Sequence, residues 1–274
     1  MEKKRILFIS QEMEPYTTGD AISTISNKLP LHLYDKNAEL RLLMPRYGTV
    51  NERRHRLHEV VRLSGINIII DESDHPLIIK VASLPSSRLQ VYFLDNEDYF
   101  KRKFLYEDAE GKPFADNGER GVFFAKGALE IVKKFGWVPD IIHCHGWMSA
   151  LVPFYLKTVY KDEPLFRDSK VVFSAYDSPA YEESFAENYK AKVAIDGLKE
   201  EDLGAFMEDG HFSLTKGSIQ YSDAIIKSGT EFPDYIETQM AKLEKPFLEF
   251  TDVEGDYNEI VEFYNSLVEE NEVV

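Results

Sequence analysis

The sequence predicts an α/β domain built on a doubly wound parallel sheet, and two observations support this fold class. Short, continuous apolar runs recur along the chain, as expected for strands that are buried on both faces of a parallel sheet. Longer stretches with helical periodicity separate most of them, which is typical of β–α units. The expected strands are Ile6–Ile9, Glu39–Met44, Ile66–Ile70, Leu77–Leu84, Leu89–Leu94, Ile141–His143, Val171–Ser174 and Ala224–Lys227.

Helices are expected between and after these strands, and the clearest covers Asn117–Phe135. Its apolar side chains fall on one face, Asp116 or Asn117 can cap its start, and Gly136 can end it. The others are Ala21–Leu33, Met148–Tyr160, Phe212–Tyr221 and Asp234–Leu243.

Two regions depart from this alternation. The stretch from about Arg53 to Leu94 has consecutive strands and predicts a hairpin-like insertion. Near the C-terminus, apolar side chains recur at helical spacing before an acidic end, namely Ile260, Phe263, Tyr264 and Leu267. We therefore expect one domain over residues 1–250. Over 251–274 we expect a helix that packs back on the domain and a frayed acidic tail.

Composition and charge limit the classes of function. The chain has 274 residues, 43% of them hydrophobic, which is enough for a packed core. Its 32 Lys and Arg residues against 48 Asp and Glu give a formal net charge of −16, which disfavours binding to nucleic acid or to an anionic membrane. The single cysteine, Cys144, allows neither an intrachain disulfide nor a cysteine-based zinc cluster. With no signal-like segment and no apolar run of membrane-spanning length, a cytoplasmic protein is expected.

The first loop, YTTGDAIS, stands where many α/β proteins bind a phosphate, between the first strand and the first helix. Thr17 and Gly19 follow the strand, but Asp20 comes next and the loop has no Lys or Arg. A carboxylate there repels phosphate, whereas aspartate is a favoured helix cap. We therefore expect Asp20 to cap the first helix, Gly19 to adopt a turn conformation, and no phosphate to bind.

Polar and aromatic residues also follow two later strands. His143 and His145 alternate along their strand, and we expect them to point to opposite faces, which argues against a metal site and leaves one as a buried hydrogen-bonding group. Trp147 is either a stacking surface for a sugar ring or a core side chain. Tyr176 and Asp177 end a buried strand, where sites of parallel sheets are built. Tyr176 is expected to hydrogen-bond rather than to act as an acid or base, because its ordinary pKa near 10 is too high.

Six segments, in order, match one enzyme family. The first is RILFISQEMEPYTTGDAISTISNKLP, which resembles E-x-x-P followed by K-T-G-G-L-x-D-V; the second is LRLLMPRYG, which resembles P-x-Y-G. The third is DNEDYFKRKFLYEDAEGKPFADNGERGVFFAKGALEIV, which resembles D-N-x-x-Y-F … D-N-x-x-R-F-x-F-F. The others are PDIIHCHGW, VVFSAYD and SLTKGSIQYSDAIIKSGTEF, which resemble P-D-x-x-H-x-H-D-W, V-F-T-x-H-N and K-G-x-x-Y-A-D-x-x-T-V-S. These motifs belong to the N-terminal half of bacterial glycogen synthases and plant starch synthases, glycosyltransferase family 5, and the resemblance covers about Arg5 to Tyr235.

The resemblance implies the GT-B fold, in which two Rossmann-like domains face a cleft, and this chain resembles the N-terminal domain alone. The family transfers glucose from ADP-glucose, or from UDP-glucose in some relatives, to the end of an α-1,4-glucan with retention of configuration. Its second domain supplies most of the nucleotide-sugar site. Because the chain stops at Val274, we expect that domain to be missing.

The family's site positions in the first loop are changed here. The lysine that contacts the donor phosphate is replaced by Thr17, and the second glycine by Asp20, after a retained Gly19. The aspartate further on is replaced by Ser23. The resemblance therefore does not imply a phosphate contact from this loop.

Positions near the reaction centre are changed as well. The aspartate of H-D-W is replaced by Gly146, although Trp147 is retained. The reaction-centre histidine of T-x-H-N is replaced by Tyr176, and the asparagine after it by Asp177. Losing one transition-state contact typically lowers a rate by about 10²–10³, so we expect the chain to lack activity on its own.

The leading hypothesis is a glycogen or starch synthase-like domain that binds α-glucan or a protein partner in α-1,4-glucan metabolism. The alternatives are an active or split glucosyltransferase that uses ADP-glucose, and a structural or dimerising domain. Neither a cofactor nor a metal is expected, and a homo-oligomer is compatible with the sequence. Aromatic side chains are the expected glucan contacts, namely Tyr99, Tyr106, Trp147 and Tyr176.

Overall fold

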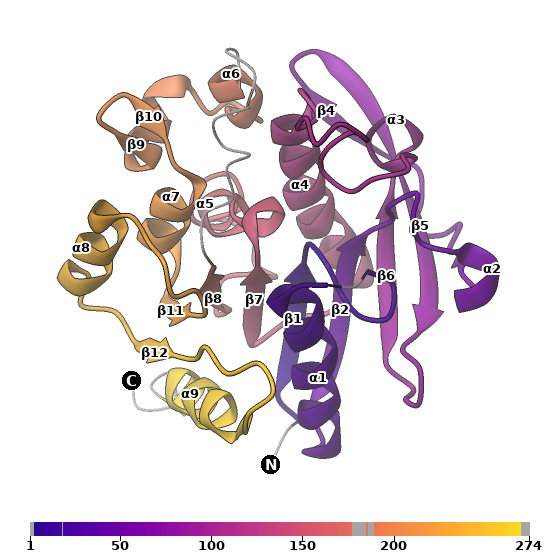
Figure 1. The fold of residues 1–274 in the computed structure, drawn as a ribbon, viewed down its shortest axis with the longest axis horizontal. Helices are drawn as coiled ribbons and strands as arrows, with labels where there is room; N and C mark the ends of the chain where they lie inside the picture. Colours follow the sequence, from indigo (N-terminus) through magenta and orange to yellow (C-terminus); the bar gives the residue numbers. More distant parts are fainter. Residues whose placement is uncertain (1–2, 18, 177–184, 186–188, 270–274) are drawn as a thin grey trace.

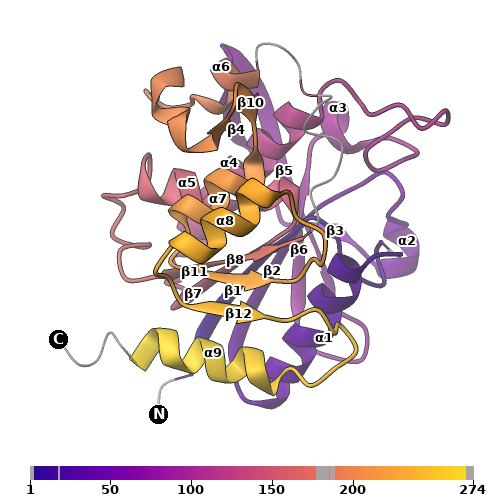
Figure 2. The same ribbon diagram turned by 60° about the vertical axis from the view of Figure 1, so that its left-hand side comes forward.

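A central sheet separates two layers of helices in the computed structural model, which describes residues 3–17, 19–176, 185 and 189–269 (Figures 1 and 2). The ten-stranded sheet has the order β12-β11-β8-β7-β1-β2-β6-β5-β3, with β4 paired to β5. Neighbours from β12 to β6 are parallel, and β5 is antiparallel to β6, β3 and β4. The expected α/β class with a predominantly parallel sheet is confirmed, as is the hairpin-like insertion.

The strands that form this sheet and a separate two-stranded sheet, β9-β10, have the following bounds: β1 Arg5–Ser10, β2 Glu39–Pro45, β3 His58–Glu59, β4 Ile66–Ile70, β5 Ser73–Ser83, β6 Gln90–Asp95, β7 Ile141–His145, β8 Lys170–Ala175, β9 Met207–Glu208, β10 His211–Phe212, β11 Ala224–Lys227 and β12 Phe247–Glu249. Every expected strand is present. The short strands β3, β9, β10 and β12 were not expected, because two or three residues give no periodicity to detect.

The helices have the following bounds: α1 Ala21–Asp35, α2 Glu52–His55, α3 Glu97–Phe100, α4 Asn117–Phe135, the 3₁₀ turn η1 Trp147–Ser149, α5 Val152–Lys157, α6 Tyr189–Val193, the 3₁₀ segment η3 Glu200–Phe206, α7 Leu214–Tyr221, α8 Asp234–Lys242 and α9 Asn258–Glu269. Figure 2 shows α1 and α9 on one face of the sheet and α4, α5, α7 and α8 on the other. Among the described residues, no helix combines the length and the apolar character needed to cross a membrane.

The helix expected over Met148–Tyr160 is wrong in its extent. The segment begins as the 3₁₀ turn η1, and the α-helix α5 covers only Val152–Lys157. Pro153 lies in the first turn of α5, where backbone N–H groups have no partner within the helix, so proline is tolerated there. The tight turn before α5 places Trp147 directly beyond the end of β7.

The helix α4 is confirmed at both ends, but its expected cap is not made. Gly136 ends it in a left-handed conformation, with φ of 58°. Asp116 occupies the N-cap position without a side-chain capping bond, because its carboxylate accepts from the guanidinium of Arg102. Asn117 donates instead to the carbonyl of Tyr106, 2.7 Å away, and so connects α4 to the loop before it.

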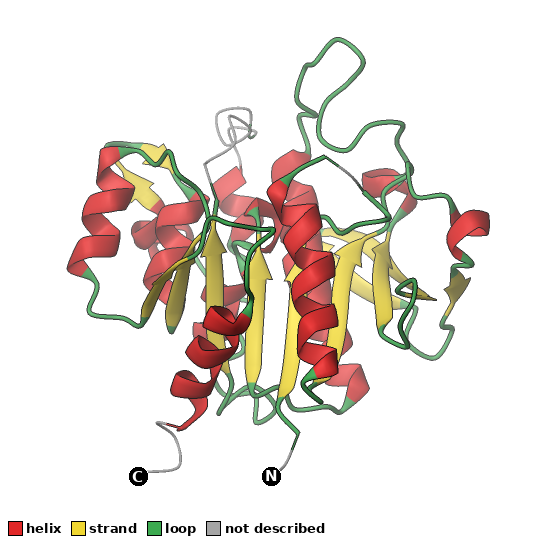
Figure 3. Cartoon of the chain, turned by 60° about the horizontal axis from the view of Figure 1, so that its bottom comes forward, coloured by secondary structure: helices red, strands yellow, loops and turns green. Residues whose placement is uncertain are grey.

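The C-terminal helix α9 packs against the sheet, as expected. Its residues Ile260, Tyr264 and Leu267 belong to the same hydrophobic core as β1 and β7. Figure 3 shows α9 beside α1 on the same face of the sheet. The expected tail, residues 270–274, lies outside the described part of the chain.

Candidate functional site

A cavity of about 640 Å³ opens at the carboxyl ends of β1, β7 and β8. This is the edge at which open parallel sheets build their sites. The loop after β1, the loop before α4 and the residues directly after β7 and β8 all contribute to it. The described residues that line it are Gln11, Glu12, Gly19, Asp20, Ile22, Leu105, Tyr106, Glu107, Gly146, Trp147, Phe173, Tyr176 and Thr215.

The cavity holds an acid pair, Glu12 and Asp20, and the described residues that line it include no Lys, Arg or His. Glu12 is only 5% exposed and accepts a hydrogen bond from the hydroxyl of Tyr106, 2.9 Å from its Oε1. Burial, and then the neighbouring charge of Asp20, raise the pKa of Glu12 to about 8. At neutral pH Glu12 therefore keeps its proton.

The first loop is organised by Asp20, which caps α1 as expected. Its Oδ1 accepts from the backbone N–H of Ser23 at 2.7 Å, and the Ser23 hydroxyl donates back to the Asp20 carbonyl at 2.9 Å. Gly19 has φ of 120°, which confirms the expected turn conformation. Ser23 is fully buried, so it stabilises the loop and does not reach a ligand.

Thr17 also contacts only its own loop. Its hydroxyl accepts from the N–H of Met13 at 2.9 Å, and the side chain does not line the cavity. The position at which the family has a phosphate-binding lysine therefore serves local structure in this chain.

Gly146 leaves no room for the family's aspartate. Its φ is 81°, and a Cβ at this position would lie 2.2 Å from Oε1 of Gln11. The side chain of Gln11, 4% exposed, fills the space that an aspartate would need. Gln11 thus connects the end of β1 to the end of β7, a role that no sequence pattern predicted.

Three of the four expected glucan contacts line the cavity, and the fourth does not. Tyr106 and Trp147 form an edge-to-face pair with ring centroids 5.4 Å apart, and Tyr176 lines the same cavity. Tyr106 and Trp147 are 8% and 7% exposed, so they form the cavity wall rather than an open stacking surface. Tyr99 packs against Phe123 and does not line the cavity. Asp177 lies outside the described residues.

His143 and His145 point to the same face of β7, so the expectation of opposite faces is wrong. Side chains two positions apart on a strand share a face, and the ring centroids of the two lie 3.8 Å apart. Both are fully buried beneath the cavity, on the face covered by α9. In the described part of the chain, no three His, Cys, Asp or Glu side chains are grouped so that they could hold a metal ion.

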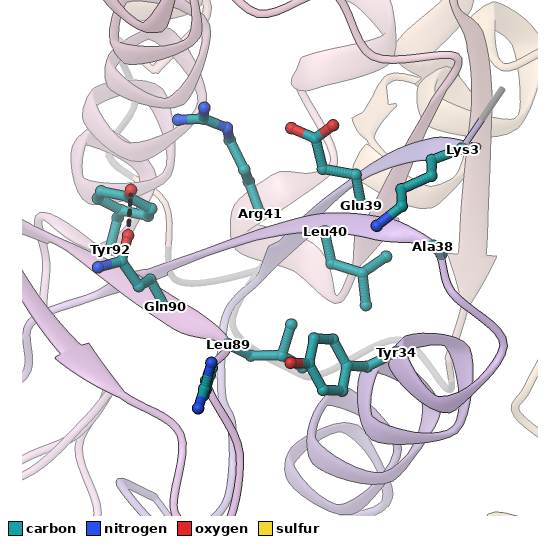
Figure 4. A pocket seen from close by; sticks show the side chains of 10 residues that line it. Lys3, Tyr34, Ala38, Glu39, Leu40, Arg41, Leu89, Gln90 and Tyr92 are labelled. Atoms are coloured by element: carbon teal, nitrogen blue, oxygen red, sulfur yellow. Dashed lines mark hydrogen bonds between the residues drawn. The ribbon is translucent and has the colours of Figure 1, made fainter.

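A second hollow of about 390 Å³ lies at the opposite edge of the sheet, near the starts of β2 and β6. Figure 4 shows Arg41 and Glu39 projecting to one side of β2 and Leu40 and Tyr34 lying on the other, so the polar groups do not converge. The larger cavity is the candidate site because its polar side chains face a common space.

The sequence alone missed Glu12 as a functional residue. It lies in the EMEP segment that matches the E-x-x-P motif, but a motif does not show burial. Its pKa is raised by burial and by the charge of Asp20, and burial is visible only in the folded chain. Carboxyl and phenol side chains thus line one cavity, where their oxygens can accept hydrogen bonds.

Comparisons with known proteins show which family this chain resembles. The family model for the starch synthase catalytic domain matches residues 5–242. Glycogen synthase of Chlorobium luteolum is 42% identical over 175 residues, which are 64% of this chain and 36% of that protein. Glycogen synthase of Chlorobaculum parvum is 32% identical over 236 residues, which are 85% of this chain and 47% of that protein. The matched regions thus span less than half the length of these relatives.

Among solved structures, the catalytic domain of Starch Synthase IV from Arabidopsis thaliana, bound to ADP and acarbose, has the same fold. The TM-score is 0.70 at 18% identity, covering 91% of this chain and 51% of that one. This supports the expected Rossmann-like N-terminal domain of a GT-B glycosyltransferase. Together with the family match, which extends over most of the sequence, it shows that the chain belongs to the starch synthase catalytic domain family.

Proposed function

We propose that this domain binds α-glucan hydroxyl groups in the cavity at the carboxyl edge of its sheet and does not itself transfer glucose. The observation that supports binding is that the carboxyl groups of Glu12 and Asp20 share one cavity with aromatic walls. Sugar hydroxyls donate hydrogen bonds to carboxylates, and the apolar faces of sugar rings pack on aromatic side chains. The structural relative from Arabidopsis thaliana binds acarbose.

The negative charge in the cavity supports the proposal that the domain does not itself transfer glucose. A nucleotide diphosphate needs cations or N–H donors around it, and none of the described lining residues is a Lys or Arg. Thr17 is folded back on its loop, and the space beside Gly146 is filled by Gln11. The acid pair would repel the diphosphate of ADP-glucose.

Affinity electrophoresis in gels that contain glycogen tests the binding. The original protein is expected to be retarded relative to a gel without glycogen, and Glu12→Gln to be retarded less. Glu59→Gln is the matched control, because Glu59 is exposed on β3, far from the cavity in the sheet order. Equal migration of the original protein in both gels contradicts glucan binding.

The family's own activity is the second candidate, because the chain belongs to a family of glucosyltransferases. Incorporation of labelled glucose from ADP-glucose into glycogen by the purified protein would show it. We expect no incorporation above a blank without protein. A rate that exceeds the blank overturns the proposal that the domain does not transfer glucose.

A further inference from the structure

Two glycines in the first turns of α4 lie under large aromatic side chains of other segments. A Cβ at Gly118 would lie 2.5 Å from Cδ2 of Tyr189. A Cβ at Gly121 would lie 3.5 Å from Cζ3 of Trp147. Glycine weakens the interior of a helix, so its use at these positions indicates that α4 must let both side chains approach closely. Of the two aromatic rings, only that of Trp147 is among the described residues that line the cavity.

The indole of Trp147 stands between α4 and the cavity. Gly121 is buried behind it, and no residue of α4 is among the described residues that line the cavity. The backbone of the turn η1 is held in place, because the N–H of Ala150 donates to the carbonyl of Trp147 at 3.1 Å. The hydroxyl of Ser149 donates to the carbonyl of Gly146 at 2.9 Å. A large side chain at Gly121 must therefore displace the indole itself, and the cavity is the open space beside that ring.

Two departures from the family motifs adjoin this indole. The segment DNGERGVFF resembles D-N-x-x-R-F-x-F-F, and Gly121 stands where that motif has phenylalanine. Gly146, directly before Trp147, stands where the motif P-D-x-x-H-x-H-D-W has aspartate. The ring of a phenylalanine lies beyond its Cβ, where the indole edge begins 3.5 Å away, and a packed interior has no space for both rings. The position of the indole in this chain therefore depends on a small residue at Gly121.

We propose that Gly121 is a specificity-determining residue, because it lets the indole of Trp147 rest against α4 and so leaves the cavity wide enough for a sugar ring. Gly121 does not touch the ligand and acts through the position of Trp147. With a bulky side chain at this position, the indole moves into the cavity and narrows the space that a sugar ring would occupy. The sugar as ligand rests on the proposed function, but the position of the indole does not.

Fluorine-19 NMR of protein labelled with 5-fluorotryptophan, recorded without ligand, tests the position of the indole. The chain has two tryptophans, so Trp137→Phe assigns both signals. Gly121→Phe should shift the Trp147 signal and leave the signal of Trp137, which lies beyond the other end of α4, in place. Gly121→Ala should shift the Trp147 signal much less, because its Cβ would make an ordinary van der Waals contact with Cζ3. An unshifted Trp147 signal in folded Gly121→Phe overturns the inference whether or not glucan binds.

Isothermal titration calorimetry with maltotriose tests the consequence for the ligand. Gly121→Phe should lower the affinity at least about 10-fold, and Gly121→Ala should change it by less than about 2-fold. Gly204→Phe is the matched control, because Gly204 is exposed in η3 with nothing within 4 Å of a Cβ. This control should change neither the Trp147 signal nor the affinity.

Gly121→Leu introduces a smaller side chain and keeps the test decisive if thermal denaturation shows that Gly121→Phe does not fold. Its shift of the Trp147 signal and its loss of affinity should lie between those of Gly121→Ala and Gly121→Phe. An unchanged affinity in a variant whose Trp147 signal has shifted contradicts the specificity role. The expected shifts, together with no binding of maltotriose by the original protein, contradict only the proposed function.

Discussion

Two clusters of charged side chains in this domain are built on opposite principles. The ion cluster joins Arg46, Asp95, Lys80 and Glu52 between β2, β5 and β6. Arg46 lies 3.0 Å and Lys80 lies 3.2 Å from Oδ2 of Asp95. The acid pair of the cavity, Glu12 and Asp20, has no cation among the described lining residues. Two cations balance two anions in the first cluster, whereas in the second only the raised pKa of Glu12 limits the charge.

The two clusters also differ in how the fold shifts the pKa values of their side chains, and this difference distinguishes a structural ion cluster from a candidate ligand site. Burial lowers the pKa of Lys80, but its hydrogen bonds to Glu52 and Asp95 outweigh this effect and raise it, so the ion cluster stays charged. Burial and the charge of Asp20 raise the pKa of Glu12, so the acid pair resists full ionisation. A compensated cluster stabilises the fold by itself. An uncompensated one costs stability and indicates a ligand that donates hydrogen bonds.

The largest expected effect comes from removing one cation of the ion cluster. Arg46→Met leaves Asp95 buried with only Lys80 beside it, because the two side chains are 8% and 3% exposed in the original protein. The free energy of unfolding should fall by about 3 kcal/mol, measured by urea denaturation at pH 7. Arg62→Met, on an exposed residue, is the control. Similar losses for both would show that the cluster is not compensated as described.

Local pattern accounts for what the sequence predicted well. The strand at Arg5–Ser10 and the helix at Asn117–Phe135 are predicted by patterns of neighbouring residues in the sequence. The apolar residues of both patterns are buried in the structure. The cap at Asp20 was predictable for the same reason, since its partner Ser23 is three residues away.

Contacts distant in sequence explain what was missed. The carboxylate of Asp116 accepts a hydrogen bond from Arg102, 14 residues away, instead of capping α4. The side chain of Gln11, which follows another strand, fills the space beside Gly146. The partner of His143 is Tyr264, 121 residues away. The position of the cavity was predictable, because parallel sheets build sites at their carboxyl edge. Its charge balance was not, because no local sequence pattern indicates contacts between residues so far apart.

Restoring the family's aspartate should be the next largest effect. In Gly146→Asp, the backbone at φ of 81° and ψ of 171°, a region almost exclusive to glycine, costs about 1–3 kcal/mol. The clash with Gln11 costs about 1–3 kcal/mol. Gly197→Asp is the matched control, because Gly197 has φ of 91° with nothing within 4 Å of a Cβ. Thermal denaturation should show a larger loss for Gly146→Asp, partly recovered when Gln11→Ala is added. Equal losses in the two glycine variants contradict the steric account of the cavity.

The acid pair should make stability depend on pH. Glu12 keeps its proton up to about pH 8 in the fold but titrates near 4.5 when unfolded, so the folded state binds more protons between these values. From this group the free energy of unfolding falls by about 1.4 kcal/mol for each pH unit of rise. The lowered pKa values of His143 and His145 act oppositely, and stability is lost as the pH falls below 6.5.

Together these groups place maximum stability near pH 6.5, measured by urea denaturation from pH 4.5 to 8. Glu12→Gln should abolish the decline above the maximum and leave the decline below it. If the free energy of unfolding of Glu12→Gln still declines above pH 6.5, groups other than Glu12 cause the decline.

The smallest expected effect separates the two roles of Asp20, which belongs to the acid pair and also caps α1. Asp20→Ala removes the cap and should lower the free energy of unfolding by about 1 kcal/mol at pH 5. Asp20→Asn keeps a side-chain oxygen for the N–H of Ser23 and should cost less there. Because Asn carries no charge, it should also lower the pKa of Glu12, so the stability of Asp20→Asn relative to the original protein should rise between pH 5 and pH 8. A constant difference across that range would mean that Asp20 acts on α1 alone, and the raised pKa of Glu12 would then come from its burial without a contribution from Asp20.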